Sequence, residues 1–111
     1  MGDSSQAEDV QYLQYTLDHI LDGTARNERI YSGWARGDTS GAQAMVRRMK
    51  VSQPAMYGRH VIGRNRGWVP RIDEMLKATE PALIVVGLYH LAGPDSILVR
   101  LREHDLKVIA I

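Results

Sequence analysis

The histidine at position 90 is the residue whose type and setting most favour chemistry. It ends the sequence Val86-Gly87-Leu88-Tyr89-His90, whose first residue, Val86, is also the last residue of the apolar run 82–86. That run predicts a strand buried on both faces, and ligands of open α/β sheets bind beyond the carboxyl ends of such strands. An imidazole there can hold a metal ion or act as a general base, because its pKa lies near neutrality. The other interpretation is a surface or capping histidine that follows a strand.

Small and polar residues around His90 favour contacts with a substrate. Gly87 lacks a side chain and would let backbone and substrate approach each other closely. The segment Gly93-Pro94-Asp95-Ser96 opens a predicted helix, and the free amides at such a helix start suit a carboxylate or a phosphate. Gly87, Gly93, Asp95 and Ser96 are therefore predicted to bind substrate.

Arg64 and Asn65 lie in a predicted helical segment that glycines interrupt. Arg64 can direct its guanidinium group at a carboxylate, or polarise a carbonyl group near His90. It can equally pair with a buried carboxylate, such as that of Asp73 or Asp38, and so fix the helices. Residue type and spacing leave both interpretations of Arg64 open.

A metal ion at His90 would need further ligands, since hydrolytic metal ions typically have three protein ligands and one open position. The chain has no cysteine, so these ligands would be histidine, carboxylate or carbonyl groups. His19, His60 and His104 stand singly on predicted helices, which favours ordinary surface or half-buried histidines. The remaining ligands would then come from a missing half of the protein or from another subunit.

Composition excludes several other classes. The 111 residues are 44% hydrophobic and 24% charged, which is typical of a globular domain. A net charge of +1 gives little attraction for phosphate, so the arginines near Trp68 predict a solvated helix face and no nucleic-acid partner. The longest apolar runs are far shorter than the ~20 residues of a membrane span, and the start resembles no signal peptide. The cellular compartment stays open.

The positioning elements are predicted from hydrophobic spacing. The stripe Val10, Leu13, Leu17, Ile20 and Leu21 indicates a helix that packs on the third and fourth helices. Further helices are expected over about 24–34, in the forties, and from about 54 to 77, with a break near 67–70. Two apolar runs, 82–86 and 107–111, flank a helix and predict a parallel βαβ unit.

The predicted fold class is thus α/β. A helical layer over residues 6–77 precedes a βαβ unit over residues 82–111, in a single domain or fragment. Parallel strands are normally buried between neighbours, so two strands form only an incomplete part of a larger, mostly parallel sheet.

Five segments together resemble the TraB/GumN family in its C-terminal half. The most specific is Val86-Gly87-Leu88-Tyr89-His90-Leu91-Ala92-Gly93-Pro94-Asp95-Ser96-Ile97, which is similar to the second Gly-x-x-His motif of the family. The other segments are Trp34-Ala35-Arg36-Gly37-Asp38, Met56-Tyr57, Arg64-Asn65-Arg66-Gly67-Trp68, and the closing Leu106-Lys107-Val108-Ile109-Ala110. The resemblance implies an α/β fold related to the Tiki-like proteases and the erythromycin esterases.

The resemblance also implies a function, namely a contribution to a metal-dependent hydrolase, with proteolysis as the implied reaction. His90 would be the metal ligand or base, Arg64 a second catalytic residue, and Asn65 a substrate contact. The implied cofactor is a divalent ion such as Mn²⁺, Co²⁺ or Zn²⁺. Alone, the chain is expected to be weakly active or inactive, and its parent protein to be exported from a bacterium.

A non-catalytic binding or oligomerisation module is the alternative function. Nothing in residues 1–80 resembles the first Gly-x-x-His motif of the family, and Gly63 stands where the family has glutamate. The partner that completes the sheet would be the missing N-terminal half or another copy, which predicts a homo-oligomer.

Overall fold

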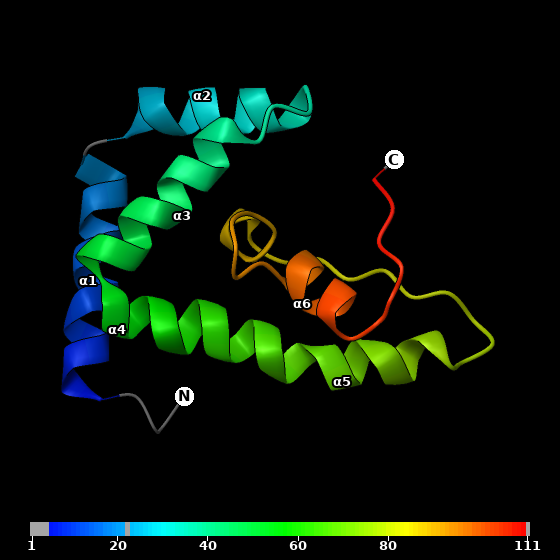
Figure 1. Ribbon diagram of the computed structural model, residues 1–111. Coiled ribbons are helices and arrows are strands. Elements are labelled where there is room, and N and C mark those ends of the chain that lie inside the picture. Colours follow the sequence, from blue (N-terminus) through cyan, green and yellow to red (C-terminus); the bar gives the residue numbers. More distant parts are fainter. Residues whose placement is uncertain (1–4, 22, 111) are drawn as a thin grey trace.

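Helices dominate the computed structural model, which describes residues 5–21 and 23–110 (Figure 1). The α-helices are α1 (Gln6–Leu21), α2 (Thr24–Ala35), α3 (Ser40–Ser52), α4 (Pro54–Tyr57), α5 (Arg64–Leu76) and α6 (Ile97–Glu103). A π-helical turn, η1 (Gly58–Gly63), joins α4 to α5, and a 3₁₀ turn, η2 (Leu88–His90), carries the candidate histidine. The helices predicted over 24–34, in the forties and after 93 are therefore confirmed.

The core lies where α2, α3 and the α4–η1 segment meet. Its buried side chains come from apolar positions spaced at helical intervals, as in the set Ala42, Val46 and Met49 of α3. The core also contains Ile30 of α2, Ala92, and three residues of the α4–η1 segment, namely Met56, Tyr57 and Val61. Ala92 belongs to the loop after η2, so the core fixes the segment that follows His90.

The segments α4, η1 and α5 run on as one long helix (Figure 1). Its start is capped from a distance, because the side-chain Oε1 of Gln11 in α1 accepts hydrogen bonds from the amides of Ala55, at 2.8 Å, and Met56, at 3.2 Å. The expected break near 67–70 is wrong, since exposed Pro70 lies inside α5. The irregularity lies earlier, in the π-helical turn.

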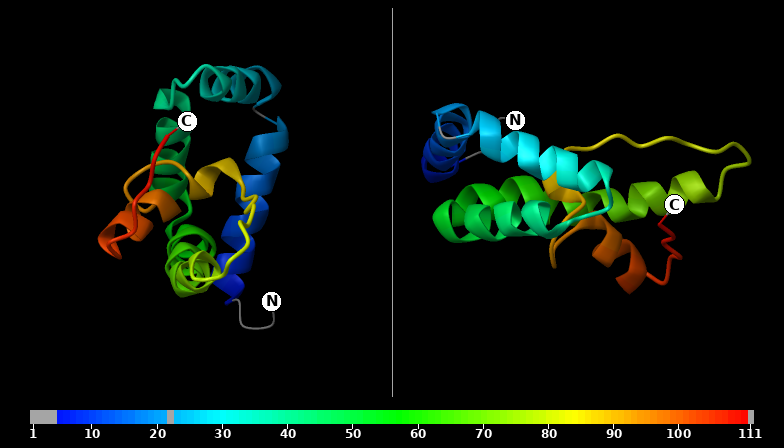
Figure 2. Two further views of the ribbon diagram at one scale, coloured as in Figure 1. Left: turned by 90° about the vertical axis from the view of Figure 1, so that its right-hand side faces the viewer. Right: turned by 90° about the horizontal axis from the view of Figure 1, so that it is seen from above.

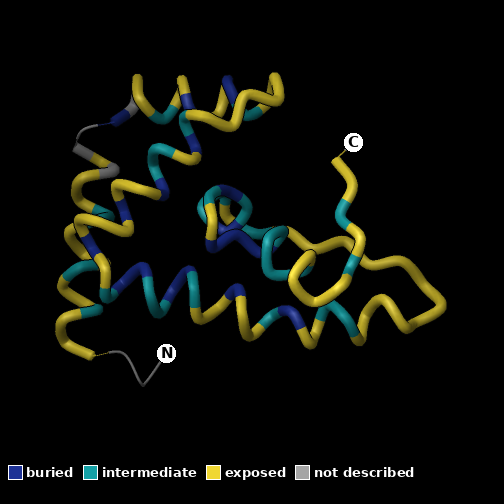
Figure 3. The backbone as a smooth tube through the Cα atoms, in the orientation of Figure 1, coloured by how far each residue is buried: buried dark blue, intermediate teal, exposed yellow. Residues whose placement is uncertain are grey.

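The predicted α/β fold class is wrong for this chain. Residues 5–21 and 23–110 contain no β-strand, and 82–86 and 107–110 have irregular backbone. Leu83 and Val85 are 90% and 84% exposed and Ile84, which alternates with them, is 44% exposed, so the run 82–86 is not buried on either face (Figure 3). The segment lies along the outside of the molecule, apart from the C-terminal segment (Figure 2).

The error has a simple physical cause. β-Branched residues favour extended backbone, but a strand becomes part of a sheet only when a neighbouring strand satisfies its amides and carbonyls. The described residues supply no such neighbour for 82–86. The molecule is correspondingly open, with a radius of gyration of 15.2 Å, against about 13 Å for a compact domain of this length.

The expected packing of α1 is also wrong in part. The helix does contact α4, but Val10, Leu13, Leu17 and Ile20 are 48%, 57%, 46% and 67% exposed. The helix packs through a different face, which carries Gln11 and Tyr15. Its apolar stripe faces away from the core.

Candidate functional site

His90 and Asn65 form the centre of the candidate site. The 3₁₀ turn η2 places the His90 ring against α5, where its Nδ1 lies 2.7 Å from Oδ1 of Asn65. Asn65 is fully buried, and its Nδ2 donates a 2.8 Å hydrogen bond to the carbonyl oxygen of Asp95. Because Nδ2 is the donor there, Oδ1 is the acceptor that faces His90, and Nδ1 must carry the proton. The neutral ring therefore has its lone pair on Nε2.

Aromatic rings enclose the His90 imidazole. The Trp68 ring of α5 lies 4.7 Å from it between centroids, and the Tyr89 ring lies 4.4 Å from it. His90 is only 3% exposed. Burial, together with the positive charge of Arg64 and the neighbouring His60, lowers the pKa of His90 from 6.5 to about 4. The imidazole is thus neutral at physiological pH.

Asp95 lies behind this pair in a buried network of hydrogen bonds. Its Oδ2 accepts from the Tyr57 hydroxyl at 2.7 Å and from Lys50 Nζ at 3.1 Å, and its Oδ1 accepts from Arg100 at 2.9 Å. Burial alone would raise the pKa of Asp95, but these hydrogen bonds and positive charges outweigh it and lower the pKa. Asp95 therefore fixes the loop after His90 as an ionised group, and its carboxylate is already committed within the protein.

Ser96 and Gly93 shape the same loop. The Ser96 hydroxyl caps α6 by accepting a 3.2 Å hydrogen bond from the Val99 amide. Gly93 has a φ of +83°, and a Cβ there would lie 3.0 Å from Val46 Cγ1 in the core. The structure thus brings Asp95 next to Asn65, while Gly93 and Ser96 shape the loop on either side of Asp95.

Gly87 makes room for an aromatic ring. A Cβ at this position would lie 2.9 Å from Cε1 of Tyr89. The ring that stacks on His90 is therefore the group that approaches Gly87 closely. With Leu88, both residues also line a cavity of about 280 Å³ beside Tyr15 and Met45, and His90 is not among its lining residues.

Arg64 acts on the site through its charge. The side chain is exposed at the start of α5, and its positive charge lowers the pKa of both His90 and His60. The two carboxylates considered as its structural partners are engaged elsewhere. Asp73 lies 3.5 Å from Lys77 and 3.8 Å from His104. Asp38 accepts hydrogen bonds from the amide and the hydroxyl of Ser40.

His60 is a neighbour that the sequence did not single out. It lies in the π-helical turn, is 7% exposed, and its Nδ1 is buried without a hydrogen-bond partner among the described residues. Its ring lies 5.1 Å from that of Tyr12 in α1. Its position four residues before Arg64, on the same helix, is the signal that could have found it. His104 is exposed, and the side chain of His19 lies outside the described residues.

The metal-ligand set is incomplete within the described part of the chain. Residues 5–21 and 23–110 hold no group of three or more histidine or carboxylate side chains able to bind one ion. His90 fits as a single ligand, because its ring is neutral and oriented. A set of three ligands would therefore need groups outside these residues.

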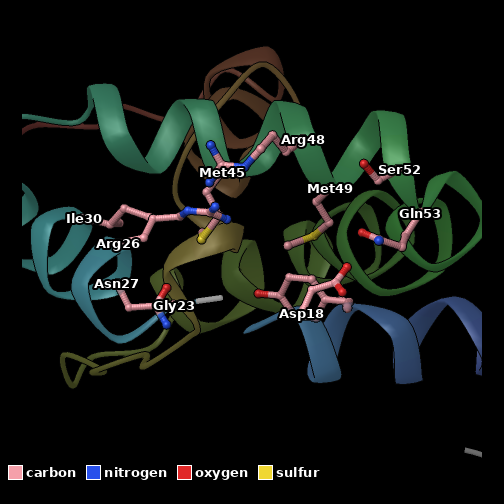
Figure 4. A pocket seen from close by; sticks show the side chains of 11 residues that line it. Asp18, Gly23, Arg26, Asn27, Ile30, Met45, Arg48, Met49, Ser52 and Gln53 are labelled. Atoms are coloured by element: carbon pink, nitrogen blue, oxygen red, sulfur yellow. The ribbon is translucent and has the colours of Figure 1, made fainter. Parts of the chain in front are cut away.

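A second cavity lies away from His90, between α1, α2 and α3 (Figure 4). Its volume is about 230 Å³. Asp18 of α1 lies on one wall, and Arg26 of α2 and Arg48 of α3 extend from the others (Figure 4). None of the predicted site residues lines this cavity, so it does not extend the His90 site.

The chain is thus a helical protein with a buried, oriented imidazole in a Gly-x-x-His turn. The profile of the TraB/PrgY/gumN family matches residues 1–110, and the chain belongs to that family. No curated protein and no solved structure matches the chain. Among the described residues, no helix is both long and apolar enough to span a membrane, as the composition predicts.

Proposed function

We propose that this chain contributes His90 as one ligand of a metal-dependent hydrolase site. The observation that carries the proposal is the 2.7 Å contact between His90 Nδ1 and Asn65 Oδ1. Histidine ligands of metal ions typically donate their second ring N–H to such an acceptor, which fixes the tautomer and the ring orientation. Asn65 is then a positioning residue, not a substrate contact.

The lowered pKa favours the ligand role of His90 over the base role. A general base works best when its pKa lies near the operating pH, and a pKa of about 4 is far below neutrality. A metal ligand needs the neutral ring, which the low pKa maintains. A bound divalent ion supplies Lewis acidity and an activated water molecule.

Arg64 is the group that would meet the substrate. Its side chain is exposed, and its charge acts on the His90 ring. A guanidinium group there can bind a substrate carboxylate or stabilise negative charge that develops on a carbonyl oxygen. Peptides and esters are therefore the substrate classes to test.

Metal binding tests the proposal directly. Calorimetric titration with Mn²⁺, Co²⁺ and Zn²⁺ compares the unaltered chain with His90→Ala, and uses His104→Ala as the matched control because His104 is exposed. Because the described residues supply only one histidine ligand, we expect weak binding, measured at high ion concentrations, that His90→Ala abolishes and His104→Ala preserves. Absence of binding at those concentrations, or binding indifferent to His90, contradicts the proposal. Hydrolysis of peptide or ester substrates that survives His90→Ala also contradicts it.

One observation favours a second function, which is association without catalysis. The run 82–86 exposes Leu83, Ile84 and Val85 by 90%, 44% and 84%. Contiguous apolar side chains of this kind mark contact surfaces. The occupant would be another part of a longer protein or another copy of the chain. Light scattering tests association of copies, since Val85→Glu should reduce the apparent mass if this run is the contact.

A further inference from the structure

The cavity between α1, α2 and α3 has a volume of about 230 Å³, and we call it the interhelical cavity (Figure 4). One face of α3 and the residue that follows this helix form its longest wall, which consists of Met45, Arg48, Met49, Ser52 and Gln53. At about 1.5 Å per residue, positions 45 to 53 span roughly 12 Å. This wall is long enough for a small molecule in an extended conformation.

Two guanidinium groups face one end of the interhelical cavity. Arg26 of α2 and Arg48 of α3 both line it, and Figure 4 shows both side chains extending toward the Met45 end. Both also line the neighbouring groove between α2 and α3, so their positive charges face a common space. Neither arginine forms an ion pair with a carboxylate of residues 5–21 and 23–110. Because a carboxylate can accept hydrogen bonds from both groups and reduce their repulsion, this end suits a carboxylate.

A buried amide without a partner faces the other end. Gln53 is only 7% exposed, and its side-chain amide forms no hydrogen bond within the described part of the chain. Figure 4 shows this amide extending toward Met49, along the cavity. A buried amide that has lost its water partners costs free energy unless another group forms hydrogen bonds with it. The Gln53 amide is therefore available to a ligand.

A carboxylate of α1 lines the same cavity. Asp18 lies across from α3 in Figure 4, and it has no ion-pair partner among the residues that the structure describes. Its negative charge favours a cation, and the Gln53 carbonyl oxygen can accept a hydrogen bond from the same cation. An ammonium group satisfies both acceptors.

Apolar side chains lie between the two polar ends. Ile30, Met45 and Met49 line the cavity, and methionine side chains adapt their shape to aliphatic chains. A ligand that satisfies all three regions has opposite charges at its ends and an aliphatic middle. We propose that the interhelical cavity binds an elongated aliphatic amino acid, with its carboxylate at Arg26 and Arg48 and its terminal ammonium group at Asp18.

NMR titration of the whole chain with 6-aminohexanoate, hexanoate and hexylamine tests the proposal, because these probes share an aliphatic chain and differ at its ends. The methyl signals of Met45 and Met49 should shift, while that of Met75 on α5 should not. 6-Aminohexanoate should bind about threefold to tenfold more tightly than either other probe, because only it forms charged hydrogen bonds at both ends. Equal affinities, or unchanged methyl signals of Met45 and Met49, overturn the proposal.

Glycylglycine tests the aliphatic middle. It also carries an ammonium group and a carboxylate at opposite ends, but its peptide group would lose water against the apolar wall without gaining partners there. It should therefore bind more weakly than 6-aminohexanoate. Tighter binding of glycylglycine overturns the aliphatic assignment.

Substitution of neighbouring arginines gives a matched pair of variants. Arg48→Gln should weaken the binding of 6-aminohexanoate about threefold to tenfold. Arg47→Gln is the control and should leave binding unchanged, because Arg47 is exposed and lines neither the cavity nor the neighbouring groove. Asp18→Asn should weaken the binding of 6-aminohexanoate but not that of hexanoate. Equal effects of Arg48→Gln and Arg47→Gln would refute the site.

Gln53→Leu separates ligand binding from a structural role. The leucine has a similar size, and no hydrogen bond of the Gln53 side chain within the described residues is lost. The free energy of unfolding should therefore not decrease, while the affinity for 6-aminohexanoate should. A loss of stability with unchanged affinity overturns the role of Gln53. His90→Ala should leave probe binding unchanged, since His90 does not line this cavity, so the result is independent of the proposed metal site.

Discussion

Replacing Asn65 by leucine should destabilise the fold and release the His90 ring. The leucine has a similar size, but it removes the acceptor for His90 Nδ1–H and the donor to the Asp95 carbonyl oxygen, which lie 2.7 and 2.8 Å from the amide. Asn65 is fully buried, so water does not replace either partner. Each buried polar group that loses its hydrogen-bond partner lowers the free energy of unfolding by about 1–3 kcal/mol, so the total loss should be roughly 2–6 kcal/mol. That is a large share of the roughly 5–15 kcal/mol that stabilises a domain.

Urea unfolding followed by tryptophan fluorescence measures this loss, because the Trp68 ring lies 4.7 Å from that of His90 between centroids. The matched control is Gln43→Leu, which removes an exposed hydrogen bond to Thr39 and should change stability by less than about 0.5 kcal/mol. Nitrogen NMR of the imidazole should show a proton on Nδ1 of His90 in the unaltered chain, and lose that preference in Asn65→Leu. If Asn65→Leu lowers the free energy of unfolding no more than Gln43→Leu does, or if Nδ1 of His90 is unprotonated, the account of the site is wrong.

Three further predictions concern pH, charge and backbone. The His90 imidazole should titrate near pH 4 by NMR, and a midpoint near pH 6.5 would contradict the burial argument. Because the pKa of His90 is lower in the folded state, the unfolded chain binds the proton first as the pH falls. The free energy of unfolding should therefore decrease from pH 6.5 towards pH 4. Asp95→Ala should lower the unfolding free energy by about 1–3 kcal/mol, since it leaves the buried Tyr57 hydroxyl without its acceptor. Lys50→Met should lower it by less than about 1 kcal/mol, because Lys50 is exposed; equal urea midpoints would refute the ranking. Gly93→Ala should lower the thermal unfolding temperature more than Gly37→Ala does. Both glycines have a φ of +83°, but only a Cβ at position 93 contacts the core. Equal decreases in the unfolding temperature would exclude the clash.

Local sequence signals were sufficient for most helices. The apolar spacing of α3 and the Ser96 cap of α6 depend on residues within a few positions of one another, so both are readable from the chain. The cap of α4 is not, because Gln11 lies 44 positions before Ala55. Ser52, two positions before Pro54, is of a type that commonly caps helices, but it lies inside α3.

The βαβ unit could not be judged from local signals either. The run 82–86 has the composition of a buried strand, and only the spatial arrangement shows that the described residues form no strand to pair with it. The composition of the run favours extended backbone, but a sheet also needs a neighbouring strand, which the pattern itself does not contain.

At the candidate site, residue setting and sequence resemblance selected His90, Arg64 and Asn65; the structure places His90 against Asn65, and the charge of Arg64 lowers the pKa of His90. The hydrogen-bond geometry of the site could not be predicted from the sequence. The tautomer of His90 depends on which amide atom of Asn65 faces it, and the role of Asp95 depends on Tyr57 and Arg100, which are distant in sequence or unremarkable in type.

The Gln11 cap also makes the docking of α1 visible to hydrogen exchange. The amide protons of Ala55 and Met56 lie in the first turn of α4, where no helical carbonyl precedes them, so their hydrogen bonds to Gln11 are what protect them from solvent. Each detachment of α1 therefore exposes both protons at once, even when the long helix stays folded. Their shared exchange rate would record how often the N-terminal helix leaves the molecule, separately from global unfolding.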